Sequence, residues 1–332
     1  MLDFHLGHQE AQHKTDTAEI YDTIIIGGGP AGLSAGLYAG RNGLNVLLLE
    51  GRVIGGQAAA TERIENWPGC HQGTGAEVVN FLRQQAESFG LKVRMEEARD
   101  VRLDGPVKVV RVSGGVLRAK TIIVATGAKP IHLGVPGEDR LQNRGVSYCA
   151  ICDAPFFRDR VVAVVGGGES ALKEADFITR FARKVYLIHR RECFRAAKAT
   201  QHRIRRNPKI EILRNTIVEA VLGEEKVSGL RLRNVSTGAH FDLQVDGLFV
   251  YVGLHPNSEL FKGKLRLNGD GYILTDANMA TNVPGVFAAG DVRNTPLRQV
   301  VTATADGAIA AEAADKYISE YEEEVRAWKA SA

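Results

Sequence analysis

A glycine-rich pattern occurs twice in the chain, and this repeat constrains the fold more than any other feature. The first copy covers residues 21–32 (YDTIIIGGGPAG) and the second residues 161–171 (VVAVVGGGESA). In both copies an unbroken apolar run, typical of a parallel strand buried on two faces, leads into a glycine turn and then into a helical pattern. Another apolar run follows each helix, at residues 46–49 and 185–188. The sequence therefore predicts an α/β protein with two βαβ units.

The glycines have the spacing of a dinucleotide-binding turn. They are Gly27, Gly29 and Gly32 in the first copy, and Gly166 and Gly168 in the second, where Ala171 stands in place of the last glycine. Between a strand and a helix, such a turn lets the pyrophosphate of a dinucleotide approach bare backbone and the helix N-terminus. The helices are expected over residues 31–39 and 171–181. The alternative is a glycine turn that serves only packing.

The second strands of the two units end differently, which predicts two different ligands. Glu50 ends the second strand of the first unit, and His189-Arg190-Arg191, with Arg195 beyond, ends that of the second at the same distance from the glycine turn. A carboxylate there accepts hydrogen bonds from ribose hydroxyls and repels a 2′-phosphate, whereas arginine side chains bind a phosphate. The first site therefore favours FAD or NAD, and the second favours NADP. A solvated basic strand end is the alternative for the arginines.

The composition argues against a nucleic-acid or membrane partner. The 332 residues carry a formal net charge of +3 without a long block of basic residues. The apolar stretch over residues 23–40 is interrupted by glycines and suits a strand, a turn and a helix better than a membrane span. The first residues lack the basic and apolar regions of a secretory signal, so a cytoplasmic protein is expected.

Two cysteines, Cys149 and Cys152, lie between the glycine turns and are followed by Asp153. Thiols separated by two residues can close a small disulfide ring that is easily reduced and reoxidised, and an adjacent carboxyl can exchange a proton with the leaving thiolate. A zinc half-site is one alternative, but zinc usually needs a second close pair, and Cys70 and Cys193 are isolated from each other. These two are expected to be buried or incidental thiols. A redox sensor without multiple turnover is another alternative.

A nicotinamide and a cysteine pair need a mediator between them. The nicotinamide donates two electrons as hydride, whereas disulfide exchange proceeds through attack by a thiolate. A flavin joins the two chemistries, because it accepts hydride and passes the electron pair to a disulfide. The first dinucleotide turn is the expected site for it.

Several short motifs surround these features in a fixed order. They are Gly55-Gly56-Gln57, Glu65-Asn66-Trp67-Pro68-Gly69, Ala125-Thr126-Gly127, Ala289-Gly290-Asp291, Arg298-Gln299-Val300 and a His-Arg-Arg-x-x-Phe-Arg stretch. Together with the cysteine pair they resemble the low-molecular-weight, bacterial-type thioredoxin reductases, which are FAD-dependent pyridine nucleotide-disulfide oxidoreductases of class II. The resemblance extends from about Tyr21 to Lys316.

The resemblance implies a fold of two Rossmann-like domains of the three-layer ββα type, the second inserted into the first. An FAD-binding domain would comprise residues 21–129 and 257–316, and an NADPH-binding domain with the cysteine pair would comprise residues 130–256. Residues 1–20 are expected to be a disordered extension and residues 317–332 a C-terminal tail. A homodimer is also implied.

The resemblance further implies specific site residues and no metal. FAD would contact Gly27, Gly29, Pro30, Ala31, Gly32, Glu50, Gly51, Gly56, Gln57, Asn66, Ala125, Thr126, Gly127, Gly290, Asp291, Arg298, Gln299 and Val300. NADPH would contact Gly166, Gly168, Glu169, Ser170, Ala171, His189, Arg190, Arg191 and Arg195. Cys152 would lie nearest the flavin, Cys149 would attack the disulfide of thioredoxin, the protein partner, and Asp153 would be the acid.

Three positions depart from the family pattern. Ala154-Pro155 follows Asp153 where members commonly have a glycine, Glu169 replaces Asp or Asn, and Lys173 replaces a frequent acidic residue. None of these changes removes a reacting group. The changes at Glu169 and Lys173 keep a second electron donor open, such as reduced ferredoxin in place of NADPH.

Overall fold

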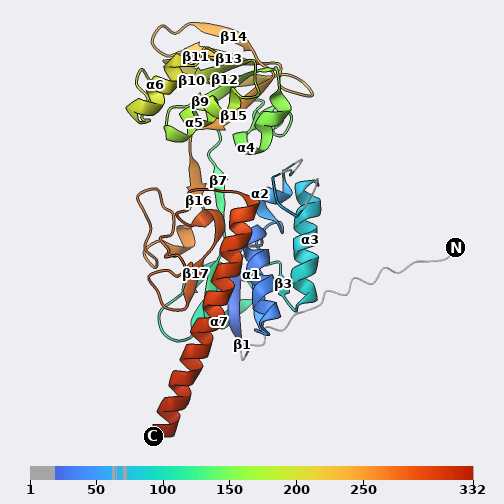
Figure 1. The fold of residues 1–332 in the computed structure, drawn as a ribbon, viewed down its shortest axis with the longest axis vertical. Helices are drawn as coiled ribbons and strands as arrows, with labels where there is room; N and C mark the ends of the chain where they lie inside the picture. Colours follow the sequence, from blue (N-terminus) through green and yellow to red (C-terminus); the bar gives the residue numbers. More distant parts are fainter. Residues whose placement is uncertain (1–18, 62–63, 65, 70–72, 332) are drawn as a thin grey trace, which may run out of the picture. The chain divides into compact units, whose positions relative to one another are not determined.

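The structure is a computed structural model that describes residues 19–61, 64, 66–69 and 73–331, with side chains described through Tyr321. Contacts divide the described residues into two compact units (Figure 1). Unit 1 lies within Met1–Gly56, Phe81–Gly127 and Ser258–Ala332, and unit 2 within Gln57–Asn80 and Ala128–Asn257. The extension expected to be disordered lies outside the described residues as far as residue 18, and so does Cys70.

Unit 1 is built on one seven-stranded sheet in the order β3-β2-β1-β6-β5-β4, with β17 also paired to β6. The strands are β1 (Ile20–Ile26), β2 (Val46–Leu49), β3 (Lys92–Arg94), β4 (Asp100–Arg102), β5 (Lys108–Val112), β6 (Gly115–Val124) and β17 (Val286–Ala288). β3, β2, β1, β6 and β17 are parallel, and β4 and β5 continue from β6 as an antiparallel meander.

Two long helices of unit 1, α1 (Pro30–Arg41) and α7 (Val300–Ser331), pack side by side (Figure 1). Their backbones approach closely at Gly307, where an added Cβ would overlap the carbonyl oxygen of Ala31. The hydroxyl of Ser34 on α1 donates to the carbonyl oxygen of Thr304 on α7 at 2.7 Å. α7 is therefore fixed against the helix that follows the first glycine turn.

The meander of unit 1 covers the sheet face that the two long helices leave free. Its buried residues form one hydrophobic core with sheet residues such as Ile24 and Leu47 and with Phe261 and Ile273 from the C-terminal part. Phe261 belongs to the 3-10 helix η2 (Glu259–Phe261), and a second one, η3 (Gly290–Val292), follows β17. Two further helices, α2 (Gly56–Ala59) and α3 (Gly75–Ser88), cross the boundaries between the units in sequence.

Unit 2, like unit 1, combines a parallel sheet with helices on one face and antiparallel strands on the other. Its parallel sheet has the order β11-β10-β9-β15-β8, beside the antiparallel sheet β12-β13-β14 and the ribbon β16-β7. The strands are β7 (Ala128–Pro130), β8 (Val146–Ser147), β9 (Val161–Gly166), β10 (Lys184–Ile188), β11 (Ile210–Leu213), β12 (Thr216–Leu222), β13 (Gly229–Asn234), β14 (His240–Gln244), β15 (Gly247–Tyr251) and β16 (Leu254–Pro256). The helices are α4 (Ala150–Asp153), η1 (Ala154–Phe157), α5 (Glu169–Ile178) and α6 (Lys198–Arg206).

Two hydrophobic cores lie on the two faces of this parallel sheet. One joins the sheet to the helices through residues such as Leu172 and Ile204. The other joins it to the antiparallel sheet through residues such as Leu230 and Leu248. The order of layers is thus helix, parallel sheet, antiparallel sheet, which is the ββα arrangement expected for the fold.

The predicted fold class is confirmed: the chain is α/β, with two Rossmann-like units and the bulk of unit 2 inserted in sequence between parts of unit 1. The predicted second strands agree with β2 and with β10 to within one residue. Helix α5 begins two residues earlier than expected and ends at Ile178 instead of residue 181. It ends there because Thr179 caps it, with its hydroxyl donating to the carbonyl oxygen of Asp176 at 2.6 Å.

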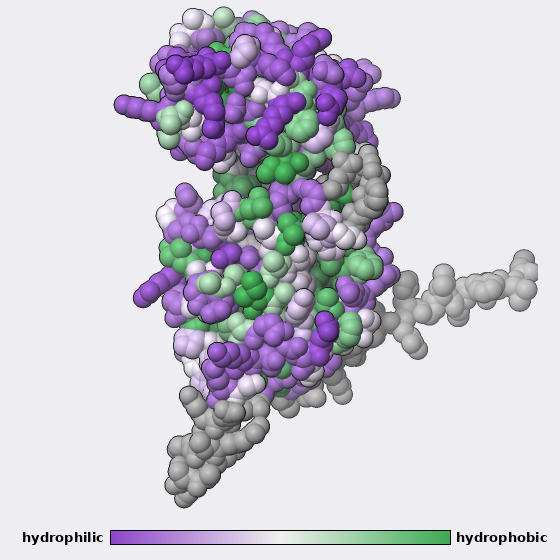
Figure 2. All heavy atoms as spheres, in the orientation of Figure 1, coloured by the Kyte–Doolittle hydropathy of each residue, from purple (hydrophilic) through white to green (hydrophobic). Residues whose placement is uncertain are grey.

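The C-terminal segment expected from residue 317 is not a separate element, because α7 runs through it to Ser331. In the part of the chain that the structure describes, no helix combines the length and the apolar character needed to cross a membrane. Figure 2 shows one face of the molecule, on which hydrophilic side chains dominate and hydrophobic ones are interspersed on each unit.

Candidate active site

Glu50 braces the first glycine turn. It follows β2, and its Oε2 accepts the backbone N–H of Gly28 at 2.8 Å while its Oε1 accepts that of Arg52 at 2.8 Å. The pairing of Ile26 with Leu49 brings the end of β2 beside the turn. Because each carboxylate oxygen has a second lone pair, Glu50 can still accept hydrogen bonds from ribose hydroxyls.

The first glycine turn also requires glycine for close packing. Gly27 has a positive φ of 112°, and an added Cβ would overlap the carbonyl oxygen of Ala125. The predicted segment Ala125-Thr126-Gly127 therefore lies beside the turn, at the end of β6. A Cβ at Gly32 would overlap the carbonyl oxygen of Gly27, so the turn and the start of α1 are in direct contact.

Gly290 and Asp291, far from the turn in sequence, return to it in the fold. Gly290 follows β17 with a φ of 73°, and a Cβ added to it would lie 2.9 Å from the Cβ of Ala31. The backbone N–H of Ala289 donates to the carbonyl oxygen of Val124 at 2.9 Å, which holds this segment beside the end of β6. The structure thus brings together the predicted residues of the first turn, the β6 end and the Gly290 turn.

Asp291 has a carboxyl group in a poorly solvated place. Burial raises its pKa from 3.8 to about 6, Arg298 opposes this rise with its positive charge, and Asp306 adds to it. The Cζ of Arg298 lies 4.4 Å from the centroid of the Tyr272 ring. Asp291 and Arg298 therefore interact electrostatically at the same edge of unit 1.

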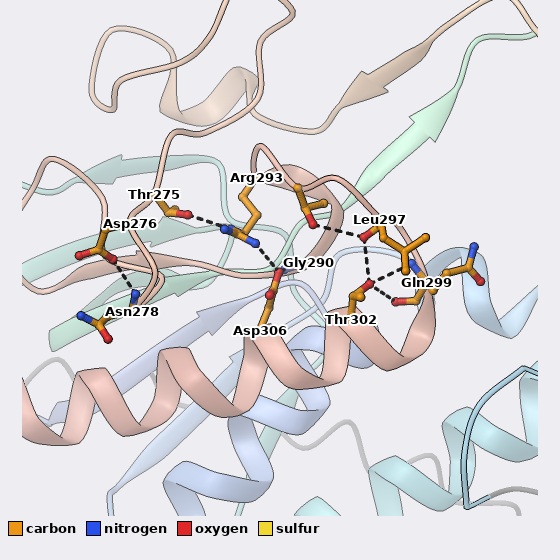
Figure 3. Close-up of polar contacts among 10 residues, drawn as sticks. Thr275, Asp276, Asn278, Gly290, Arg293, Leu297, Gln299, Thr302 and Asp306 are labelled. Carbon is orange, nitrogen blue, oxygen red and sulfur yellow. Dashed lines mark hydrogen bonds and ion pairs between the residues drawn. The ribbon is translucent and has the colours of Figure 1, made fainter. Parts of the chain in front are cut away.

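A polar network behind Gly290 was not foreseen from the sequence (Figure 3). Asp306 Oδ2 accepts the backbone N–H of Gly290 at 3.0 Å and pairs with Arg293 Nη1 at 3.0 Å. Arg293 Nε donates to the hydroxyl of Thr275 at 2.8 Å. Asp306 is only 8% exposed. The network ties the Gly290 turn to the second turn of α7.

Two features of unit 1 fit a bound flavin dinucleotide. A Cβ added at Gly29, the N-cap of α1, would meet nothing within 4 Å, so space is open beside the helix N-terminus. Arg298 Nε is buried and has no hydrogen-bond partner among the described residues. A buried donor without a partner is costly unless a ligand or water satisfies it. Pyrophosphate at α1 and a ring acceptor at Arg298 would satisfy both features.

The remaining predicted FAD residues lie in different surroundings. An added Cβ at Gly56 would lie 3.9 Å from the Cα of Gly29, so Gly56 is close to the turn. Gly51 packs against Glu97. Gln57 groups with unit 2, where its Nε2 donates to the carbonyl oxygen of Ala128, and the segment containing Asn66 groups with unit 2 as well. Contacts thus group residues 57–80 with unit 2, whereas the sequence placed them in the FAD-binding domain.

Gln299 and Val300 lie at the start of α7, which they help to cap (Figure 3). The backbone N–H of Gln299 donates to the hydroxyl of Thr302 at 3.1 Å, and that hydroxyl donates to the carbonyl oxygen of Leu297 at 2.9 Å. The capped start of α7 therefore has a fixed position next to Arg298.

In unit 2 the second glycine turn packs against an imidazole. A Cβ at Gly167 would overlap the ring of His189, which is 7% exposed and lies 3.1 Å through Nε2 from the carbonyl oxygen of Cys193. Burial lowers the pKa of His189, and the neighbouring arginines lower it further. His189 is therefore neutral near pH 7 and packs against the glycine turn.

The arginines of the basic cluster have the accessibility that phosphate binding needs. Arg190, Arg191 and Arg195 are all exposed. The backbone N–H of Arg195 donates to the carbonyl oxygen of Gly167 at 2.8 Å, which holds the loop that carries the arginines onto the glycine turn. A Cβ at Gly168 would meet nothing within 4 Å. The turn and the basic cluster are thus brought together.

Glu169 is engaged within unit 2. Its carboxylate accepts the backbone N–H of Ala197 at 2.9 Å and the hydroxyl of Thr200 at 2.7 Å, and Lys173 Nζ lies 3.2 Å away. These contacts lower the pKa of Glu169 to about 2. Ser170 and Ala171, next along α5, are exposed and buried, respectively. The two departures at Glu169 and Lys173 thus pair with each other.

Cys149 and Cys152 form a disulfide, with Cα atoms 5.3 Å apart. Cys149 caps α4, and its Sγ accepts the backbone N–H of Cys152 at 3.2 Å. The backbone N–H of Asp153 donates to the carbonyl oxygen of Cys149 at 3.0 Å. The disulfide, Asp153 and the second glycine turn all belong to unit 2. Cys193, expected to be buried or incidental, is a free and exposed thiol.

A serine next to the disulfide contacts Asp153 directly. The hydroxyl of Ser147 donates to Asp153 Oδ2 at 2.5 Å and accepts the backbone N–H of Cys149 at 3.1 Å. Ser147 is 4% exposed. The sequence gives no signal for this role, because a serine on a short strand has many other uses.

Tyr251 supports α4 from the end of β15. Its hydroxyl accepts the backbone N–H of Ala150 at 2.5 Å. Burial raises the pKa of Tyr251, and the charges of Glu174 and Asp153 raise it further, so the phenol stays protonated. Burial also raises the pKa of Glu174. Tyr251 and Glu174 are thus poorly solvated, and the charge of Asp153 acts on Tyr251.

Residues 21–307 match the family model described as pyridine nucleotide-disulphide oxidoreductase. The chain belongs to this family. Membership makes the chain an oxidoreductase and implies the use of a nicotinamide nucleotide and a flavin. The two dinucleotide-type turns and the disulfide agree with this description.

Known relatives within the family are named thioredoxin reductase. That of Peptoclostridium acidaminophilum is 46% identical over 306 residues, covering 90% of this chain and 97% of the relative. The bifunctional thioredoxin reductase/thioredoxin of Mycobacterium leprae is 45% identical over 305 residues, covering 91% of this chain and 67% of the relative. The solved thioredoxin reductase of Streptococcus pyogenes MGAS5005 superimposes with a TM-score of 0.87 at 42% identity, covering 91% of this chain and 99% of that one. The resemblance recognised from the sequence is confirmed.

Proposed function

We propose that this oxidoreductase transfers electrons from NADPH, through FAD and the Cys149–Cys152 disulfide, to oxidised thioredoxin. The observation that carries the proposal is the disulfide next to Asp153, in the same unit as a glycine turn with exposed arginines. The names of the similar proteins support thioredoxin as the partner. In the Mycobacterium leprae relative, the name assigns both reductase and thioredoxin to one chain.

Unit 1 is the proposed FAD domain, and residues 57–80, which the sequence placed in that domain, group with unit 2 by contacts. The N-terminus of α1 would receive the pyrophosphate, because its first N–H groups lack a side-chain cap. Glu50 would accept hydrogen bonds from the ribose hydroxyls, and Asp291 and Arg298 would contact the ribityl and ring parts. When bound, FAD supplies the two-electron link between a hydride donor and a disulfide.

Unit 2 is the proposed NADPH domain. Gly166 and Gly168 let the pyrophosphate approach the backbone at the start of α5, which also lacks a side-chain cap. Arg190, Arg191 and Arg195 would bind the 2′-phosphate, since their exposed guanidinium groups can each donate two hydrogen bonds. His189 would contribute indirectly, by packing against Gly167 and so holding the glycine turn in place.

The protein residues carry out the disulfide exchange. In the reduced pair, the thiolate of Cys149 attacks the disulfide of thioredoxin and forms a mixed disulfide, with one thioredoxin sulfur leaving. Cys152 then attacks Cys149, which restores the Cys149–Cys152 bond and releases thioredoxin as a dithiol. Asp153, held by Ser147, would supply the proton to the leaving thiolate and take it back from the pair.

A homodimer and a cytoplasmic location complete the proposal. Both were expected from the sequence, and a reducing compartment suits a disulfide that must be opened in each cycle. Sedimentation of the purified protein tests whether it is a homodimer, and fractionation of cells tests whether it is cytoplasmic.

An alternative electron donor, such as reduced ferredoxin, is the second candidate. Glu169 places a carboxylate in the first turn of α5, where a pyrophosphate would be repelled, although Lys173 and Ala197 engage that carboxylate. Steady-state reduction of thioredoxin with NADPH, NADH or reduced ferredoxin separates the candidates. NADPH should give the highest kcat/KM. If only reduced ferredoxin supports turnover, ferredoxin and not NADPH is the donor, and the chain is still a disulfide reductase.

A further inference from the structure

The described part of α7 carries a buried carboxylate that the proposed reaction does not use. We propose that Asp306 is a positioning residue for the flavin: it holds the Gly290–Asp291 turn in the place where that turn can contact FAD. The inference rests on the proposed assignment of FAD to unit 1. It concerns a positioning role, because the side-chain contacts of Asp306 are to the Gly290 N–H and the Arg293 guanidinium (Figure 3).

One oxygen of Asp306 makes both contacts that define its role. Oδ2 accepts the N–H of Gly290 at 3.0 Å and pairs with Nη1 of Arg293 at 3.0 Å. Arg293 is itself held by the hydroxyl of Thr275 at 2.8 Å. The side chains of Asp306 and Arg293 are only 11% and 13% exposed. A buried carboxylate needs such a partner, because an unpaired charge would be strongly destabilising there.

Close packing restricts the movement of the Gly290–Asp291 turn. Gly290 has a φ of 73°, and its Cα faces Ala31 so closely that an added Cβ would lie 2.9 Å from the Cβ of Ala31. Ala31 is in the first turn of α1, where the pyrophosphate is expected. A shift of Gly290 therefore alters the distance between Asp291 and the dinucleotide turn.

The network also connects this turn to a helix that is anchored elsewhere. α7 packs on α1 along Gly307 and through the Ser34–Thr304 hydrogen bond. Asp306 lies between these two contacts in sequence. Through Asp306, the pair of helices thus helps to fix the position of the Gly290–Asp291 turn.

The test compares FAD retention by purified holoprotein variants on serial dilution and ultrafiltration, with thermal unfolding measured in parallel. Asp306→Ala removes both contacts, and Asp306→Asn keeps an oxygen that can accept the Gly290 N–H. We expect Asp306→Ala to weaken FAD binding roughly tenfold, the size of one lost hydrogen bond to a charged group. Asp306→Asn should restore most of the affinity.

The matched control is Thr23→Val, which removes the buried hydrogen bond between the side chains of Thr23 and Thr121 in unit 1 without touching Gly290 or the α1–α7 pair. It should lower the unfolding temperature and leave FAD affinity unchanged. Arg293→Met should weaken FAD binding in the parent and have little additional effect in Asp306→Ala, because Arg293 acts through Asp306.

Equal FAD affinity of Asp306→Ala and the parent would overturn the inference, and so would Asp306→Asn binding as weakly as Asp306→Ala. If Asp306→Ala does not fold, Arg293→Met decides, because it removes the ion pair that holds Asp306: FAD affinity of Arg293→Met equal to that of the parent overturns the inference. A parent protein that retains no FAD contradicts the proposed function instead, so the two failures are distinguishable.

Discussion

The hydroxyl of Ser147 donates a 2.5 Å hydrogen bond to Asp153, the proposed acid, while it accepts the backbone N–H of Cys149, the proposed attacking residue. A single buried side chain therefore fixes the acid relative to the disulfide. Ser147 was absent from the residues expected from the sequence.

The first prediction removes this contact. Ser147→Ala should lower kcat for thioredoxin reduction about tenfold, because one hydrogen bond to a charged group is lost. Rapid reduction of the flavin by NADPH should be unchanged, since that step does not need the acid. Ser147→Thr should recover much of the rate. Ser258→Ala, which removes another buried serine hydroxyl bonded to the Gly271 carbonyl, is the control for a general loss of stability.

The second prediction concerns the choice of nucleotide. Arg191→Ala should raise the KM for NADPH roughly ten- to a hundredfold, because a charge-assisted contact to the 2′-phosphate is lost. The KM for NADH should stay within about twofold, since NADH lacks that phosphate. Arg205→Ala, an exposed arginine on α6, is the matched control. An equal effect of Arg191→Ala on both nucleotides would contradict binding of the 2′-phosphate.

The third prediction separates the two cysteine steps from hydride transfer. Cys152→Ser should still be reduced at the flavin by NADPH but should not turn over thioredoxin, because the disulfide cannot form. Cys193→Ser should keep normal turnover, since that thiol is free and exposed and makes no disulfide. Normal thioredoxin turnover by Cys152→Ser would eliminate the disulfide route.

The fourth prediction follows from the raised pKa of Asp291. Because the folded pKa of about 6 exceeds the ordinary value of 3.8, the folded protein binds more protons than the unfolded chain between these values. The favourable contribution of Asp291 is complete below pH 3.8 and is lost as the pH rises through about 6. At pH 7.5, Asp291→Asn should therefore stabilise the FAD-free protein by up to about 2–3 kcal/mol.

Urea unfolding of the FAD-free parent and variant at pH 5 and pH 7.5 measures this effect. The gain from Asp291→Asn should be smaller at pH 5, while FAD binding by the variant should weaken because the proposed ribityl contact changes. A gain that does not depend on pH would mean that Asp291 is not the titrating group.

The sequence predicts those parts of the fold and site that follow from local patterns. The apolar runs identify β2 and β10, and equal spacing places Glu50 and His189 at equivalent strand ends, as the pairs Ile26–Leu49 and Val165–Ile188 show. Side-chain direction was less predictable. His189 packs against Gly167, which has no side chain, and the carbonyl oxygen of Cys193 is the hydrogen-bond partner of its Nε2.

Partners from distant segments could not be predicted from one sequence. Asp306 meets Gly290 and Arg293 because α7 packs on α1, and no periodicity in the chain records this contact. Ser147 reaches Asp153 because α4 reverses the chain after Cys149. The first contact therefore depends on tertiary packing, and the second depends on a short helix that no periodic pattern in the sequence identifies.

An anaerobic titration of the purified flavoprotein tests the central claim most directly. Stoichiometric NADPH should bleach the flavin absorbance, and oxidised thioredoxin should restore it through repeated cycles. A flavin that stays oxidised with NADPH but is reduced by dithionite would contradict the donor. A bleached flavin that thioredoxin fails to reoxidise would contradict the Cys149–Cys152 route.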